Sequence, residues 1–331
     1  MKPVISKFYF VLIVLLFTSA LHAQEKKILI PVEGPNGKFG FLNQKFNLLE
    51  PFEYDEVTAF SDNRVWGKKG NIYYCFNEKG DTVFTGDYQE VSAFSEGFSK
   101  IRKNNKYGFI DKQGKITIPP AFDYASDFSE GLSVVKKSGY YGYIDIHGAI
   151  VIECEFTKAQ PFSNGFAVVE DKYFINKSGQ IVFQKFAQAN SFSEGLAAVS
   201  LSWPYKYGYI DTLGRLAIPY QFLDAGSFSE GLARVQPWNN PKYGYIDKTG
   251  KIVIKPQFDF PADFSEGLAC VSKVQKLEDV PLYGFINTKG KFIIPMRYEK
   301  PASFSNGHAI VKQQGNIRII DKTGKCVYNC N

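Results

Sequence analysis

The sequence is poor in the residues and motifs from which most enzyme active sites are built. It has three histidines in 331 residues, and His22 lies in the expected leader described below. His147 falls in a predicted turn, so no Ser/His/Asp or Cys/His set can be assembled. The chain contains no G-x-S-x-G, H-E-x-x-H, Walker or EF-hand pattern. The sequence therefore predicts a protein that is not an enzyme and that needs neither a cofactor nor a metal.

Cysteine is scarce, and its spacing is irregular. The five cysteines are Cys75, Cys154, Cys270, Cys326 and Cys330. An odd number at uneven spacing is not a disulfide framework, and no C-x-x-C pair suggests zinc. We expect Cys270 to pack as a small hydrophobe. By default we expect Cys326 and Cys330 to be free thiols, with a bond across the C-terminal tail as the alternative.

Clustered charge and long hydrophobic runs are also missing from most of the chain. The net charge is +6, but the basic residues are scattered, which argues against a nucleic-acid partner. The one long apolar run, Phe8 to Phe17, follows Lys2 and Lys7 and precedes small residues ending at Ala23. This pattern predicts a signal peptide over residues 1–23, with a retained membrane anchor as the alternative. We therefore expect an exported protein, periplasmic or on the cell surface or secreted, without a membrane span after signal removal.

What the sequence does contain is a repeat. The phrase Phe-Ser-Glu-Gly starts at Phe94, Phe128, Phe192, Phe228 and Phe264, with variants at Phe60, Phe162 and Phe304. A second phrase, Tyr-Gly-aromatic-Ile-Asp/Asn, starts at Tyr107, Tyr141, Tyr207, Tyr243 and Tyr283. With the degenerate copies, the phrases define nine units of about 34 residues.

These phrases resemble the bacterial tryptophan–glycine (WG) repeat family and its KWG relatives. The resemblance rests on stretches such as residues 264–269 (Phe-Ser-Glu-Gly-Leu-Ala) and 242–247 (Lys-Tyr-Gly-Tyr-Ile-Asp), and it covers roughly residues 28 to 328. Tyr or Phe stands where the family has Trp before Gly. The resemblance implies a β repeat of bacterial proteins, which are often exported and mostly of unassigned function, and it supplies no catalytic residues to carry over.

Each unit predicts three to four short antiparallel strands with tight turns between them. Along the strands, Ala233 and Val235 share a small face, whereas Tyr243 and Tyr245 share an aromatic face. We expect the aromatic face of one unit to pack on the small face of the next, which would explain the glycine at position 244. The predicted fold is thus all-β, with one repeat domain over residues 24–331.

Two architectures fit such a repeat: an open, curved array of stacked units and a closed β-propeller. Propellers usually have four to eight blades, and nine units exceed that number. The end units are also degenerate, since Tyr74 and Arg318 stand where other units have glycine, and His308 stands where they have Leu or Phe. Atypical terminal units are typical of caps. The sequence therefore favours the open array, with the propeller as the alternative.

The repeated carboxylates predict turns, not catalysis. They occupy two positions per unit, and some units carry Asn there instead, which a catalytic acid could not tolerate. These positions are Glu96, Glu130, Glu194, Glu230 and Glu266, and Asp111, Asp145, Asp211, Asp247 and Asp321. A polysaccharide hydrolase is therefore the least favoured functional hypothesis.

One loop lengthens in three consecutive units. The loop's length is measured from the last Val or Ile of the strand before it to the Tyr that follows it. This distance is six positions in the unit with Ile101 and Tyr107, but twelve positions in the unit with Val271 and Tyr283. The lengthened loops carry the candidate ligand-binding residues Trp203, Tyr205, Trp238, Asn239 and Asn240. Exposed aromatics beside amides suit a glycan, peptide or protein partner, whereas the alternative is that the Trp side chains fold back over the sheet edge. The leading hypothesis is a binding or scaffold module, and the second is a structural envelope protein that associates through its end units.

Overall fold

The computed structural model describes residues 29–34, 36–183, 185–202, 206–274 and 280–330, so the expected leader lies outside the described residues. In these ranges the chain forms thirty β-strands and no helix, in small antiparallel sheets of which none closes into a barrel. No helix able to cross a membrane occurs among the described residues. The predicted all-β, tandem-repeat architecture is confirmed.

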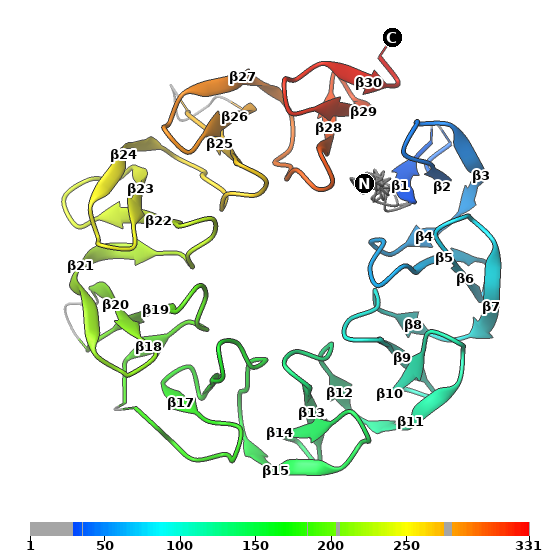
Figure 1. The fold of residues 1–331 in the computed structure, drawn as a ribbon, viewed down its shortest axis with the longest axis horizontal. Coiled ribbons are helices and arrows are strands. Elements are labelled where there is room, and N and C mark those ends of the chain that lie inside the picture. The colour runs from blue at the N-terminus through cyan, green and yellow to red at the C-terminus, as the bar shows by residue number, and fades with distance from the viewer. Residues whose placement is uncertain (1–28, 35, 184, 203–205, 275–279, 331) are drawn as a thin grey trace, which may run out of the picture.

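Nine consecutive units make up the fold (Figure 1). Units 1 to 4 comprise β1 (Ile30–Glu33), β2 (Phe39–Leu42) and β3 (Leu48–Tyr54); β4 (Glu56–Val57), β5 (Val65–Lys69), β6 (Ile72–Phe76) and β7 (Thr82–Asp87); β8 (Glu90–Val91), β9 (Phe98–Lys103), β10 (Lys106–Asp111) and β11 (Ile116–Phe122); and β12 (Tyr124–Ala125), β13 (Leu132–Lys137), β14 (Tyr140–Asp145) and β15 (Ile150–Phe156).

Units 5 to 9 follow the same plan. They comprise β16 (Ala167–Val169) and β17 (Tyr173–Ile175); β18 (Gln188–Ala189), β19 (Leu196–Ser200), β20 (Tyr207–Asp211) and β21 (Leu216–Ala225); β22 (Leu232–Pro237), β23 (Tyr243–Asp247) and β24 (Ile252–Phe258); β25 (Leu268–Ser272), β26 (Tyr283–Asn287) and β27 (Phe292–Tyr298); and β28 (His308–Gln313), β29 (Asn316–Asp321) and β30 (Cys326–Tyr328). Because β21 continues from unit 6 into unit 7, these two units share one seven-stranded sheet.

The register of the central hairpin gives every unit two distinct ends. In unit 7, Leu232 at the start of β22 pairs with Asp247 at the end of β23. The turn before β22 and the turn after β23 therefore lie together, and we call this the turn end. The connection between β22 and β23, residues 238–242, lies at the opposite end, which we call the loop end.

The turn end is built by the residues that recur most faithfully. Ser229 and Leu232 exchange two backbone hydrogen bonds, with Glu230 at φ 53° and Gly231 at φ 79°. This is the two-residue hairpin turn that needs positive φ at both central positions. In the second turn, the Asp247 carboxylate accepts the N–H groups of residues 249 and 251. The interpretation of the repeated acids as turn residues is borne out at these positions.

The glycine before the second aromatic has a different cause from the predicted one. A Cβ at Gly244 would lie 2.4 Å from the backbone oxygen of Ile254, in the last strand of the same unit. The register between β23 and β24 shifts at this point, which brings the two backbones together. In unit 2, β6 and β7 pair without a shift there, and Tyr74 takes the glycine's place. The glycine therefore accommodates a bulge in its own unit and not the aromatic ring of a neighbour.

Neighbouring units interlock as predicted. Tyr245 of unit 7 is fully buried in a cluster with Phe264, Ala269 and Val271 of unit 8. Its ring meets that of Phe264 edge-on at 4.9 Å, and its hydroxyl donates to the Ala262 oxygen at 2.7 Å. The aromatic face of one unit thus lies on the small face of the next, where apolar burial contributes about 25 cal/mol per Å².

The ends of the array meet, so the favoured open array was wrong. Nine buried clusters each join two units, and the ninth joins unit 9 to unit 1 through Ile319, Val32 and Leu42. An open array of nine units has only eight junctions. Phe46 of unit 1 also packs edge-on against His308 of unit 9, with centroids 4.8 Å apart. The units form a closed ring, with their last strands on the outer rim (Figure 1).

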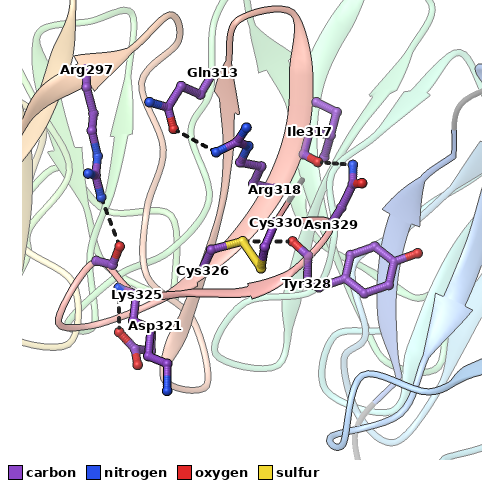
Figure 2. Close-up of a disulfide and its surroundings, with 11 residues drawn as sticks. Arg297, Gln313, Ile317, Arg318, Asp321, Lys325, Cys326, Tyr328, Asn329 and Cys330 are labelled. Atoms are coloured by element: carbon purple, nitrogen blue, oxygen red, sulfur yellow. Dashed lines mark hydrogen bonds between the residues drawn. A yellow bond between two sulfur atoms is a disulfide. The ribbon is translucent and has the colours of Figure 1, made fainter.

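The C-terminal tail is closed by a disulfide, contrary to the default expectation of free thiols. Cys326 and Cys330 are bonded to each other, and Asn329 between them donates to the Ile317 oxygen at 2.7 Å (Figure 2). Tyr328 packs at the junction with unit 1. The four-residue separation favours this pairing because the tail turns back toward β29 directly after β30.

Candidate functional site

The three lengthened loops lie at the loop ends of units 6, 7 and 8, as their position between paired strands requires. They connect β19 to β20, β22 to β23, and β25 to β26. Two of the predicted ligand-binding residues, Trp203 and Tyr205, lie outside the described residues. The site is therefore built from the loop of unit 7 and the strand ends beside it.

Trp238 is the most prominent side chain of this region. It is 47% exposed, and the Lys206 ammonium of unit 6 lies 4.7 Å from its ring centroid. Such a cation–π contact holds the ring in place without covering all of it. Trp238 therefore presents an aromatic surface to solvent, and the alternative in which it folds back over the sheet edge is not observed.

The two asparagines beside Trp238 have different roles. The Asn240 side chain accepts the N–H of Lys242 at 2.9 Å, and its backbone N–H donates to the Pro237 oxygen. Asn240 therefore shapes the loop. The Asn239 side chain is exposed to solvent.

A cavity of about 360 Å³ lies between units 7 and 8, next to the lengthened loops. Its position follows from Tyr243 and Tyr283, which begin β23 and β26 directly after the loops of those two units. Arg234 and Asp259 add polar groups, and Phe260, which is 52% exposed, adds an apolar surface. Aromatic walls with a few fixed polar groups are the usual features of a ligand site.

Charge in the cavity is balanced locally. Arg234 forms ion pairs with Asp263 (3.3 Å) and Asp224 (3.7 Å). Tyr243 donates to Asp224 at 3.0 Å, and burial followed by this hydrogen bond raises the pKa of its phenol above the ordinary value. Because the phenol stays protonated, the cavity offers neutral hydrogen-bonding groups and a paired guanidinium.

Asp259 is the one carboxylate that lines the cavity directly. Partial burial alone would raise its pKa, but hydrogen bonds from Lys242 and from the Val274 N–H outweigh burial and hold the pKa below its usual range. Asp259 is therefore ionised and paired. The thiol of Cys270, which also lines the cavity, has its pKa raised to about 11 by burial, so it is a poor nucleophile.

Arg234, Asp259, Tyr243 and Tyr283 were not among the predicted site residues. Arg234 had a signal in the sequence, because most other units carry an apolar residue at its position, such as Val134, Ala198 or Cys270. The cavity itself depends on how two units pack, which repeat spacing does not reveal. Among the described residues, no group of three or more His, Cys, Asp or Glu side chains is arranged to hold a metal ion.

The repeated carboxylates at the turn end join one unit to the next. Glu230 of unit 7 accepts the Gly267 N–H of unit 8 at 2.8 Å, and Ser229 donates to the Phe264 oxygen at 2.8 Å. We call this pair of bonds the turn staple. The same staple recurs at the other junctions from unit 3 to unit 9, with Asn164 accepting in place of Glu in unit 5.

Lysines reinforce some of these staples. Lys248 approaches Glu194 to 3.0 Å. Partial burial alone would raise the pKa of Glu194, but the hydrogen bonds from Lys248 and from the Gly231 N–H lower it overall. The recurrent acids are therefore held in structural bonds between units.

Comparisons with known proteins agree with this architecture. The family model of the WG containing repeat matches residues 39–73, 75–107, 107–141, 141–172, 174–202, 207–236, 243–276 and 283–316. A crystal structure of a eukaryotic initiation factor superposes with a TM-score of 0.62 at 11% identity, covering 91% of this chain and 95% of that chain. At that identity, the likeness concerns the fold alone.

Two further solved structures are more distant. Hsv2 of Kluyveromyces marxianus gives a TM-score of 0.40 at 13% identity, over 63% of this chain and 85% of that one. A catalytically inactive virginiamycin B lyase from Staphylococcus aureus with quinupristin gives 0.36 at 16% identity, over 80% and 97%. No curated protein sequence matches the chain.

Proposed function

This chain belongs to the family of WG-repeat proteins, and from that premise we propose that it is an exported, non-catalytic binding module whose ligand site is the loop end of units 6 to 8. The observation that carries the proposal is that the loop end of these units combines the half-exposed ring of Trp238 with a cavity lined by Tyr243, Tyr283 and Arg234. The ligand that suits these groups is a glycan or a peptide segment. Either presents a surface that stacks on an aromatic ring and hydrogen-bonding groups for phenols and a guanidinium.

A binding role fits the state of the titratable groups better than catalysis does. A general acid or base must be available to the reacting group, whereas Asp259 is committed to Lys242 and Val274, and Arg234 to Asp224 and Asp263. The acids that recur in most units are occupied by turns and staples. The hydrolase hypothesis therefore has no available acid pair among the described residues of this site.

The ring also weakens the second hypothesis, in which the protein associates through its end units. That hypothesis needed exposed end sheets, but Val32 and Leu42 of unit 1 are buried against Ile319 of unit 9.

Glycan and peptide arrays probed with the exported chain test the proposal, with Trp238→Ala as the test variant. The matched control is Tyr140→Ala, because Tyr140 is 49% exposed at the loop end of unit 4, where the loop is short. We expect Trp238→Ala to weaken binding at least tenfold and Tyr140→Ala to leave it unchanged. Equal effects of the two substitutions would remove the site from these units.

The expected export is tested separately. Sequencing of the N-terminus of the protein recovered from outside the cytoplasm should give Gln24 as the first residue. Recovery of the intact N-terminus from the cytoplasm would contradict the proposed location.

A further inference from the structure

Two junctions of the ring share one arrangement of polar groups at the loop end: the junction of units 3 and 4, and that of units 7 and 8. Lys242 of unit 7 binds Asp259, which starts the connection to unit 8. The Tyr243 hydroxyl donates to Asp224 at 3.0 Å. The counterparts between units 3 and 4 are Lys106 with Asp123, and Tyr107 with Glu90. The two junctions lie on opposite sides of the ring (Figure 1).

A cation in the middle of a strand completes this arrangement. Arg234 of β22 forms an ion pair with Asp263 at 3.3 Å. Lys100 of β9 forms the equivalent pair with Asp127 at 3.7 Å. Both aspartates directly precede the phenylalanine of the Phe-Ser-Glu-Gly phrase. The frame of charged groups is therefore the same at both junctions, and the junctions differ in the aromatic residues that this frame surrounds.

Between units 3 and 4, the frame holds an aromatic ring of the chain itself. The Tyr124 ring contacts those of Tyr107 and Tyr141 edge-on, with centroids 6.3 Å and 5.7 Å away. Edge-on aromatic pairs are favourable beyond the apolar area that they bury. Tyr107 and Tyr141 are the repeat counterparts of Tyr243 and Tyr283, which line the cavity between units 7 and 8. Tyr124 therefore shows which kind of group such a pair of tyrosines accepts.

Between units 7 and 8, the corresponding ring does not contact the two tyrosines. Phe260 stands at the position of Tyr124, but in the described part of the chain its ring pairs with neither Tyr243 nor Tyr283, and it is 52% exposed. These three side chains instead line the cavity of about 360 Å³. A ring therefore fills one junction, and a cavity lies at the other.

The residue after Phe260 accounts for this difference. It is Pro261, where unit 4 has Ala125. Unit 4 forms the short strand β12 at this point, whereas residues 259–262, all described, form no strand. Proline fixes φ far from the value of an antiparallel strand. Phe260 is therefore not held against the tyrosines as Tyr124 is.

We propose that the cavity between units 7 and 8 binds an aromatic side chain of a partner peptide, in the place that Tyr124 takes between units 3 and 4. The inference rests on the proposed function, because it concerns the same loop end, and it selects a peptide over a glycan. The ligand's ring packs edge-on against Tyr243 and Tyr283. An apolar cavity of about 150 Å³ is enough for a benzene molecule, so this cavity has room for the side chain of Phe, Tyr or Trp.

The polar groups of the cavity favour an aromatic ring over a sugar. The hydroxyls of a buried sugar need hydrogen-bonding partners. Arg234 is already paired with two aspartates, and Asp259 with Lys242. Much of the remaining lining is apolar, and it includes Phe260 and Pro261. An aromatic ring contacts these groups without needing a new polar partner.

The experiment is isothermal titration calorimetry of the exported chain with the end-capped peptide Gly-Ser-Tyr-Ser-Gly. We expect saturable binding with a Kd below about 1 mM. Replacing the peptide's tyrosine by alanine should abolish binding, because the ring supplies the contacts. A neutral trisaccharide of glucose, titrated in the same way, should not compete with the peptide.

Variants that exchange the two junctions test the position of the site. Phe260→Tyr/Pro261→Ala gives unit 8 the residue pair of unit 4, so its own ring should fill the cavity and weaken peptide binding about tenfold or more. Adding Tyr124→Ala to this variant opens the other junction and should restore binding. The matched control is Tyr140→Ala, which should leave the Kd unchanged, because its counterpart Leu282 does not line the cavity.

Three results would overturn the inference. The first is no saturable binding of the peptide up to about 1 mM, and the second is an unchanged Kd in the Phe260→Tyr/Pro261→Ala variant. The third is binding of the trisaccharide that this variant abolishes, which would assign the cavity to a glycan. In each case, array binding that is lost in Trp238→Ala would leave the proposed function standing, so the two proposals can fail separately.

Discussion

Replacing Tyr245 by alanine tests the interlock between units at one well-defined point. The side chain is fully buried between units 7 and 8, and its hydroxyl donates to the Ala262 oxygen. Truncation of a buried aromatic side chain costs about 3–5 kcal/mol, because apolar contacts are lost and a cavity remains. Tyr245→Phe keeps the ring and removes only the hydrogen bond, so we expect it to cost about 1–2 kcal/mol.

The assay is urea unfolding followed by circular dichroism, with Tyr140→Ala as control. Tyr140 is 49% exposed, so its truncation should change the free energy of unfolding by less than about 0.5 kcal/mol. A double-mutant cycle with Phe264→Ala should show a coupling of about 1 kcal/mol, since the two rings are in contact across the junction. If Tyr245→Ala costs no more than Tyr140→Ala, the packing of one unit's aromatic face on the next unit's small face is refuted.

Three further outcomes follow from the turn staples and the buried thiols. Glu230→Ala removes the acceptor of the Gly267 N–H and should lower the free energy of urea unfolding by about 1 kcal/mol. Glu230→Asn should leave it nearly unchanged, because Asn tolerates positive φ and accepts the same hydrogen bond. If the two variants lost equal stability, the staple would be contradicted. Glu194 has a lowered pKa in the folded state, so its contribution to stability is present above its unfolded pKa near 4.5 and is lost as the pH falls through the lower folded value. A Glu194→Gln variant should therefore unfold with a weaker dependence on pH below 4.5, and an unchanged acid profile would contradict this assignment. Burial raises the pKa of the Cys75 thiol to about 12. At pH 8, iodoacetamide should therefore modify the half-buried Cys154 well before Cys75, which peptide mass spectrometry would detect. Equal rates of modification at the two cysteines would contradict the burial of Cys75.

Repetition made much of the fold predictable from sequence. Because side chains alternate along a strand, the spacing of Ala233, Val235 and Tyr245 was sufficient to assign the two faces and their contact across units. The turn role of the recurrent acids was equally accessible, since Asn replaces them in some units. These predictions depend on local geometry, which the repeat displays many times.

Features that depend on the whole ring were harder to predict from the sequence. The atypical residues Tyr74 and Arg318 suggested caps of an open array. In the structure, Tyr74 pairs with the last strand of its unit without the bulge that requires glycine, and Arg318 lies outside the pairing of β29 with β30. The curvature that brings unit 9 onto unit 1 accumulates from small rotations at every junction, and no single phrase of the sequence encodes it. The glycine at position 244 was predicted correctly as a structural residue but for the wrong reason.

The candidate site was predictable only in part. Loop lengthening pointed to the loop end of units 6 to 8 and to Trp238, which is exposed, while Trp203 and Tyr205 fall outside the described residues. Arg234 and Asp259 reach the cavity from a mid-strand position and from an inter-unit connection, which are brought together by packing alone. A search for charged residues at positions that are apolar in other units would have found Arg234.

Closure of the ring is the central claim, and a double-mutant cycle between Leu42→Ala and Ile319→Ala tests it most directly. Both side chains are fully buried, in the cluster that joins unit 1 to unit 9. In a closed ring, each substitution should cost about 2–5 kcal/mol in urea unfolding, and the two should be coupled by about 1 kcal/mol. Strictly additive free energies, with no coupling between the first and last units, would contradict the closed ring.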